Sequence, residues 1–201
     1  MHSSMAPHQR VLRAEDWEDE RMSDNDRAHR ARSAVVVEFR TLDAQLDVYR
    51  TRLDPSRALG VPAHVTLLYP FVPPNRLDVA VWGALGAAIA GVPPFDAEFA
   101  TASWFGRDVL WLAPTPVAPF SRLIERIRSA FPECEPYSGG VDEPVPHLTI
   151  ADRADSGEMV AAAEGVSALL PLAARVSAVS VMAGSDAPQS WRTLRRFELT
   201  G

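Results

Sequence analysis

The chain has 201 residues, of which 47% are hydrophobic and 23% are charged, with a formal net charge of −6. This length suits one large domain or two small lobes that share a core, and the negative balance argues against a broad electrostatic grip on duplex nucleic acid. No apolar run approaches the roughly 20 residues that span a bilayer, and the N-terminus lacks a secretion signal, so we expect a cytoplasmic protein.

Residues 1 to 32 are charged, mixed in sign and poor in periodic apolar residues, which predicts a disordered leader, with Met22 as an alternative start. The remaining residues, 33–201, are expected to fold as one domain. Its first half alternates strands and helices. Strands are predicted over 33–39, around His64 and over 95–105, with amphipathic helices over 42–53 and 76–90.

The second half repeats this order. It has a strand over 108–114, a helix with an apolar stripe from Phe120 to Phe131, and a Pro/Gly/acid loop over 132–146. A strand over 147–151, a helix over 157–169 and strands over 174–182 and 191–199 follow. The order β-α-β-α-β therefore occurs twice, with one extra strand. This duplication predicts a bilobal α+β fold with a central cleft between two small, mainly antiparallel sheets backed by helices.

Each half carries one histidine and one threonine at the same spacing on a strand. "VPAHVTLLYP" contains His64 and Thr66, and "PHLTIAD" contains His147 and Thr149. Because strand side chains alternate faces, the histidine and threonine of each pair share one face and the aliphatic residues share the other. Two such faces that meet across a cleft would flank one phosphate with two imidazoles and two hydroxyls.

This combination suits the opening of a 2′,3′-cyclic phosphate. An imidazole with a pKa near ~6.5 serves as base or acid at neutral pH. One neutral histidine activates water while the other, protonated, supplies a proton to the leaving oxygen, and no metal is needed. The threonine hydroxyls are expected to bind the phosphate oxygens. The residue types do not decide which of His64 and His147 is the base and which is the acid.

Composition excludes several other chemistries. All 20 basic residues are arginine, which excludes Schiff-base enzymes, lysine-adenylate ligases and phosphate loops that need a lysine. The single cysteine, Cys134, forms neither an internal disulfide nor a multi-cysteine metal site. It is expected to be an inert loop thiol. The scattered carboxylates indicate no metal cluster, so neither a metal nor another cofactor is expected.

The segments "HVTLLYPF" and "HLTIAD", together with the ending "WRTLRRFEL", resemble the two-histidine phosphoesterase superfamily in its 2′-5′ RNA ligase-like branch. The resemblance covers about residues 33 to 200. It implies a bilobal α+β fold and metal-independent cleavage, or in some members reversible joining, of 2′,5′-linked or cyclic phosphodiesters. It implies that His64 and His147 are catalytic and that Thr66 and Thr149 bind phosphate. The chain has Asp152, followed by Arg153, where some members carry a basic residue.

Five further residues are candidates for substrate binding, each with a structural alternative. Tyr69 and Phe71 either stack on a base or pack at a strand end. Tyr137 either forms a wall over the cleft or belongs to a plain surface loop. Arg153 follows the second motif. Arg192 alternates with Arg196 along the last strand, with Arg195 opposite, so that one set faces phosphate or all are solvated.

These features predict a monomeric phosphoesterase that acts on a 2′,3′-cyclic nucleotide, a 2′,5′-linked nucleotide or an RNA end, without an obligate protein partner. Two alternatives remain open. One is a non-catalytic nucleotide- or RNA-binding module with the same cleft. The other is a hydrolase of small cyclic-phosphate metabolites, such as an ADP-ribose derivative.

Overall fold

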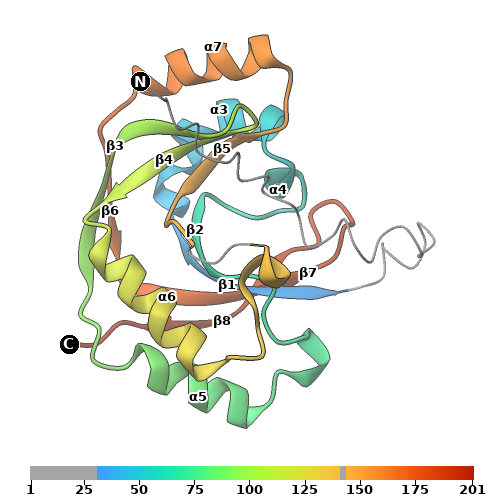
Figure 1. Cartoon of the computed structure of the whole chain (residues 1–201), viewed down its shortest axis with the longest axis vertical. Helices are drawn as coiled ribbons and strands as arrows, with labels where there is room; N and C mark the ends of the chain where they lie inside the picture. The colour runs from blue at the N-terminus through green and yellow to red at the C-terminus, as the bar shows by residue number, and fades with distance from the viewer. Residues whose placement is uncertain (1–30, 141–143) are drawn as a thin grey trace, which may run out of the picture.

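The computed structural model describes residues 31–140 and 144–201, whose arrangement is shown in Figure 1. The disordered leader and the start at Met22 stay predictions, because residues 1–30 lie outside the described residues. The described strands are β1 (Arg32–Glu38), β2 (His64–Leu68), β3 (Phe95–Phe105), β4 (Val109–Thr115), β5 (Leu148–Asp152), β6 (Leu172–Val176), β7 (Ala178–Gly184) and β8 (Arg192–Glu198). The described α-helices are α3 (Asp43–Leu53), α4 (Pro55–Ala58), α5 (Val79–Ile89), α6 (Ala118–Ala130) and α7 (Ser156–Ser167), and short 3-10 helices cover Arg40–Leu42, Pro74–Arg76 and Pro136–Gly139.

These strands form two four-stranded antiparallel sheets. Sheet A has the order β2-β1-β7-β8, and sheet B has the order β5-β4-β3-β6. Every neighbouring pair is antiparallel. The two orders correspond when β2 is matched with β5, β1 with β4 and β7 with β3, which is the pattern of a duplication. The predicted α+β class with two small antiparallel sheets is confirmed.

One predicted strand is two strands. The segment 174–182 was expected to be continuous, but the chain leaves sheet B after Val176, the last residue of β6, and enters sheet A at Ala178 with β7. The burial patterns explain the difference. β6 is an edge strand whose middle residues are partly or fully exposed, whereas the first six residues of β7 are all buried between β1 and β8. Both kinds of strand are rich in β-branched and small residues, so propensity alone does not separate them.

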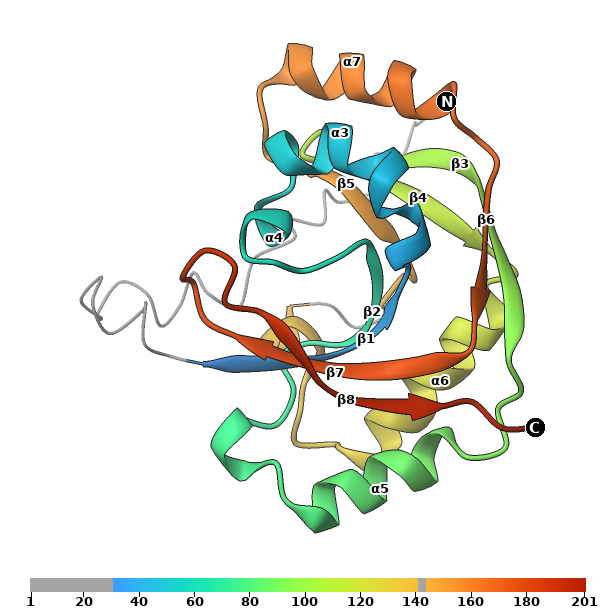
Figure 2. The ribbon, with the colours of Figure 1, turned by 180° about the vertical axis from the view of Figure 1, so that it is seen from behind.

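The helices lie on the outer sides of the two sheets, and each half contributes helices to both. Helix α6 packs on β2 and on α5, whereas α3 packs on β5 and on α7. Figure 2 shows α5 and α6 beside sheet A and, at the opposite end, α3 and α7 beside sheet B. A helix from one half thus supports the histidine-bearing strand of the other half, which makes the two halves one interlocked unit.

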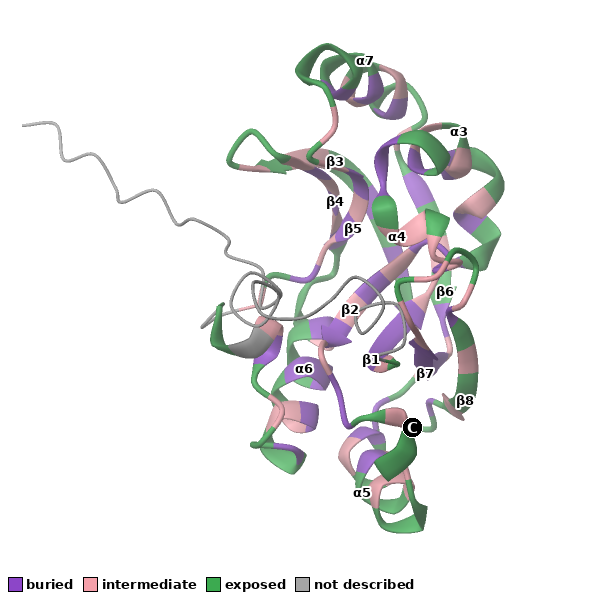
Figure 3. Ribbon diagram, turned by 90° about the vertical axis from the view of Figure 1, so that its right-hand side faces the viewer, coloured by how far each residue is buried: buried purple, intermediate pink, exposed green. Residues whose placement is uncertain are grey.

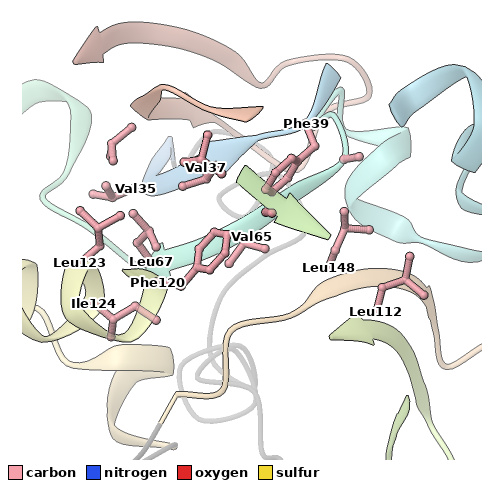
Figure 4. Close-up of a cluster of buried hydrophobic side chains, with 14 of the residues drawn as sticks. Val35, Val37, Phe39, Val65, Leu67, Leu112, Phe120, Leu123, Ile124 and Leu148 are labelled. Atoms are coloured by element: carbon pink, nitrogen blue, oxygen red, sulfur yellow. The ribbon is translucent and has the colours of Figure 1, made fainter. Parts of the chain in front are cut away.

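A single apolar cluster joins the two sheets. It includes Val65 and Leu67 of β2 together with Leu148 and Ile150 of β5, all at most 2% exposed, and Figure 4 shows much of it around Phe120. Aromatic edges fill its centre. The ring of Phe39 lies 5.1 Å from that of Phe99, and the ring of Phe120 lies 5.0 Å from that of Phe95. Along β2 and β5 the aliphatic positions are buried, whereas the histidine, the threonines and Asp152 are only partly so (Figure 3). The aliphatic residues of both motifs therefore point into the core, as predicted, and turn the histidines and threonines the other way.

None of the helices in the described ranges combines the length and the apolar character that a membrane crossing requires.

Candidate active site

The first motif lies on β2 at the edge of sheet A. Glu38 of β1 pairs with His64, and the next same-face pair places Val36 opposite Thr66. Beyond them the register shifts, so that Leu68 pairs with Val35. This β-bulge turns both leucines after Thr66 toward the core, where Leu67 and Leu68 are 2% and 1% exposed. We call the face that carries His64 and Thr66 the site face of sheet A.

The second motif has the same design on β5 at the edge of sheet B. Thr149 pairs with Trp111 of β4, and after a register shift Ala151 pairs with Leu110 and Asp152 with Val109. The bulge again comes directly after the threonine. The site face of sheet B therefore carries His147, Thr149, Trp111 and Asp152. Equal placement of two bulges in the two halves supports the duplication inferred from the motifs.

Both imidazoles are held in the same way by the backbone just before the strand. Nδ1 of His64 lies 2.9 Å from the carbonyl oxygen of Pro62, and Nδ1 of His147 lies 2.7 Å from that of Val145. A carbonyl oxygen only accepts, so each Nδ1 carries the hydrogen and each neutral ring leaves Nε2 unprotonated. Two rings with a free Nε2 provide two equivalent positions for taking up or releasing a proton.

The two motifs lie close to one another. Strands β2 and β5 are in contact, and the charge of His147 acts on His64. Burial is the main cause that lowers the pKa of His64, to about 4. Arg50 and His147 lower it further, against the raising effects of the Pro62 carbonyl and Asp54.

The pKa of His147 is also lowered, chiefly by burial, against the raising effects of the Val145 carbonyl and Asp54. These lowered pKa values favour the uncharged form of both rings at neutral pH. A negative charge placed beside either ring would favour its protonated form.

Acid is expected to destabilise the protein through His64. Unfolding restores a pKa near 6.5, so below that pH the unfolded chain takes up a proton that the folded chain does not, and stability falls from about pH 6.5 to about pH 4. The two pKa values differ by an amount that corresponds to roughly 3 kcal/mol. Urea unfolding at pH 7 and pH 4 should show a smaller loss of stability for His64→Gln than for the unaltered protein. Equal losses in both would contradict a neutral, buried ring.

Two aromatic residues that were not among the sequence candidates lie against His147. The ring of Phe105 is 4.9 Å from the imidazole and perpendicular to it, and the ring of Trp111 is 5.9 Å away. Phe105 and Trp111 stack on each other at 4.7 Å. The Nε1 atom of Trp111 is buried without a hydrogen-bond partner. The two-residue alternation of side chains along β3 and β4 could have indicated that both residues lie on this face. Phe105 pairs with Val109, and Val109 shares its face with Trp111.

Tyr137 lies against the first motif. Its hydroxyl hydrogen-bonds the side chain of Thr66, and its backbone N–H donates to the carbonyl of Tyr69 at 2.6 Å. Burial raises the pKa of the phenol, and the hydrogen bond with Thr66 opposes this. Its φ of 50° is in the left-handed region, which non-glycine residues adopt mostly where the surroundings demand it. The structure thus brings Tyr137 together with Thr66, and its role toward substrate stays a prediction.

The two aromatic residues that follow the first motif, Tyr69 and Phe71, are partly or fully buried. Phe71 is 4% exposed and its ring packs 4.9 Å from that of Phe131 in the core. For Phe71 the structure therefore favours the packing alternative over stacking on a base. The ring of Tyr69 is partly buried between those of Tyr137 and Trp191, at 6.5 and 6.2 Å.

A bulge also rearranges the arginines of β8. Arg196 pairs with Ser180 and faces the site side of sheet A, where its guanidinium hydrogen-bonds Glu198 and Ser177. The register then shifts, so that Val181 pairs with Arg195, Met182 with Thr193 and Ala183 with Arg192. The prediction that Arg192 and Arg196 share one face of β8, with Arg195 on the other, is therefore wrong. Arg192 shares the opposite face with Arg195, because Leu194 is an extra residue that reverses the order of faces.

Arg153 comes directly after β5, with a φ of 54° and its N–H bonded to the carbonyl of Asp108 at 2.7 Å. Its Nε lies 3.9 Å from the carboxylate of Asp152, which shares the site face with Thr149. Cys134 lines a groove together with residues of α6, and burial raises its thiol pKa to about 11. Across residues 31–140 and 144–201, no three His, Cys, Asp or Glu side chains gather as a metal-binding group.

Two matched halves, each with a His-x-Thr strand on the facing edge of its sheet, define the class of two-histidine phosphoesterases. A model of the 2′-5′ RNA ligase superfamily matches residues 38–187, and the chain belongs to this family. The resemblance inferred from the motifs is confirmed.

Solved structures show the same fold. TT0787 of Thermus thermophilus has a TM-score of 0.58 and 22% identity, over 85% of this chain and 98% of that chain. LigT of E. coli complexed with 3′-AMP has a TM-score of 0.54 and 21% identity, with the same coverage of both chains. LigT complexed with phosphate has a TM-score of 0.52 and 20% identity, again with this coverage. No curated protein matches the sequence.

Proposed function

We propose that this protein is a metal-independent phosphoesterase that cleaves 2′,3′-cyclic phosphates or 2′,5′-linked phosphodiesters at a nucleotide or RNA end. One observation carries the proposal. His64 is the first residue of β2 and His147 directly precedes β5, two strands in contact, and each ring has its Nδ1–H bonded to a backbone carbonyl. Their Nε2 atoms are therefore the groups that exchange protons with a phosphate between them.

The reaction requires two proton transfers on opposite sides of phosphorus. One neutral imidazole takes a proton from water as the water oxygen bonds to phosphorus. The other, protonated because the substrate anion favours its charged form, gives its proton to the ribose oxygen as the P–O bond breaks. A cyclic phosphate yields a nucleoside monophosphate in this way. His64 and His147 exchange roles when the reaction runs in reverse.

The two threonines supply the electrostatic part. The hydroxyls of Thr66 and Thr149 donate to the non-bridging phosphate oxygens, whose charge grows in the transition state. Tyr137, whose hydroxyl already meets Thr66, extends this side of the pocket. On the other side, Phe105 and Trp111 form an apolar wall beside His147, which suits contact with a ribose or a base.

The ligands of a related structure agree with this chemistry. LigT of E. coli has been crystallised with 3′-AMP and with phosphate. A nucleoside monophosphate is the product that opening of a 2′,3′-cyclic phosphate would give here. We therefore choose a cyclic mononucleotide as the first substrate to test.

The test is hydrolysis of 2′,3′-cyclic AMP by the purified protein in excess chelator, followed across pH. We expect turnover that the chelator does not reduce, with a bell-shaped dependence of kcat/KM on pH. The His64→Gln/His147→Gln double variant, prepared in the same way, sets the background.

Other outcomes would overturn the proposal in distinct ways. Turnover that stops with chelator and returns with added metal would show another mechanism. Binding of nucleoside monophosphate without turnover of cyclic or 2′,5′-linked substrates would indicate a binding module. Turnover confined to small cyclic phosphates that are not nucleotide ends would indicate a metabolite hydrolase.

A further inference from the structure

A fully buried arginine lies behind the first motif. Arg50 of α3 is 0% exposed, and its Nε and Nη2 atoms donate to the carboxylate of Asp54 at 3.0 and 2.8 Å. Asp54 is itself 5% exposed. The Nη1 atom of Arg50 has no hydrogen-bond partner and lies 3.8 Å from a carboxylate oxygen of Asp43. Burying a charged pair costs desolvation free energy even when its hydrogen bonds are well made, so this pair is not explained by stability alone.

The charged cluster of Arg50, Asp54 and Asp43 forms hydrogen bonds with the three-residue segment that precedes His64. Arg50 donates to the carbonyl of Val61 at 3.4 Å, and the carboxylate of Asp43 accepts the N–H of Ala63 at 2.7 Å. Between these two anchors lies Pro62, whose carbonyl accepts the Nδ1–H of His64 at 2.9 Å. The direction of that carbonyl, and with it the tautomer of the catalytic ring, depends on the anchors on either side.

The cluster also acts on His64 through its charge. The Arg50 cation lowers the pKa of the imidazole, and the Asp54 anion raises it, beside the larger effect of burial. The other charged groups that face the ring are His147, across the site, and Glu38 on β1, its register partner. Glu38 is already bound by Arg40 and Thr193. Arg50 and Asp54 thus influence the ring in opposite directions.

We propose that Arg50 is a positioning residue for His64 and fixes the ring through the Val61–Ala63 segment. The kinetic part of this inference rests on the proposed function, whereas the positioning of the ring does not. Arg50 touches no reacting atom in this arrangement and acts only through His64.

The test uses NMR of ¹⁵N-labelled histidine side chains, which reports the tautomer and the pKa of His64 without any turnover. In Arg50→Met we expect the pKa of His64 to rise, because the cation is gone and Asp54 is left unopposed. We also expect the Nδ1–H tautomer to become mixed. In Asp54→Asn we expect the opposite shift, a lower pKa, with the tautomer kept because Arg50 still reaches Val61. Asparagine still accepts from Ser56 N–H, which preserves the cap of α4.

The matched control is Arg52→Gln. Arg52 lies on α3 as Arg50 does, but its exposed side chain pairs with Glu158 of α7. Its His64 signals should be unchanged. For hydrolysis, Arg50→Met should lower kcat by roughly tenfold or more with little change in KM, because the phosphate-binding threonines remain.

Folded Arg50→Met with an unaltered tautomer and pKa of His64 would overturn the proposal. Should Arg50→Met fail to fold, Arg50→Lys decides, because lysine keeps the cation but lacks the fork that reaches both Asp54 and the Val61 carbonyl. A mixed tautomer of His64 in this variant supports the proposal, and an unaltered tautomer overturns it. An inactive protein that shows the expected NMR shifts would contradict the proposed function and leave the positioning role intact.

Discussion

Replacing either histidine with alanine is expected to lower kcat/KM for 2′,3′-cyclic AMP by about 10²–10⁴-fold. The reason is that each ring performs one proton transfer with an Nε2 atom that no neighbour replaces, since the Nδ1 of His64 and of His147 is occupied by a carbonyl. Steady-state kinetics of His64→Ala and His147→Ala measure the loss. It should appear mainly in kcat.

The double variant is expected to be little worse than either single one, because the two rings act as one unit and losing one already stops the concerted transfer. Ser129→Ala, on the exposed side of α6, serves as a control and should keep full activity. Single variants with near-normal kcat, or losses that simply multiply in the double variant, would argue against a shared reaction.

Replacing the threonines with valine is expected to reduce kcat by about 10²–10³-fold each. Valine keeps the shape and the β-branching of threonine on the strand but removes the hydroxyl. Thr66→Val and Thr149→Val therefore test the donation of a hydrogen bond to phosphate, with little effect on folding. The measurement is kcat and KM for 2′,3′-cyclic AMP, alongside thermal unfolding.

Serine at these positions should restore most of the activity, because it returns the hydroxyl. Thr115→Val, at the exposed end of β4, is the matched control and should behave like the unaltered protein. If the serine variants were as impaired as the valine variants, the contribution of the two residues would be packing and not donation.

Much of the architecture follows from the sequence because the relevant signals are local. Period-two alternation places Val65 and Leu67 in the core and turns His64 and Thr66 away from it, as found. The apolar stripe of α6 likewise identifies the buried face of that helix. The matching order of elements in the two halves then indicates two similar sheets.

The features that the sequence patterns did not reveal, the bulge in β8 and the buried arginine of α3, depend on contacts between residues far apart in the chain or in different elements. A bulge adds one residue without a distinctive composition, so the change of face at Leu194 is not visible in the run of arginines on β8. Arg50 lies four residues after Leu46 on the buried stripe of α3, although arginine side chains are mostly exposed in proteins. It is buried because Asp54, Ser56 and the Val61 carbonyl, which belong to the following loop and α4, accept its hydrogen bonds.

The most direct test of the central claim is an NMR titration of the ¹⁵N-histidine-labelled protein with 2′-AMP. If both rings flank one phosphate, the side-chain signals of His64 and His147 move together along one binding curve, and at least one ring gains a proton at a pH where both were neutral. A response confined to one histidine, or binding of 2′-AMP that leaves both rings unchanged, would contradict the account.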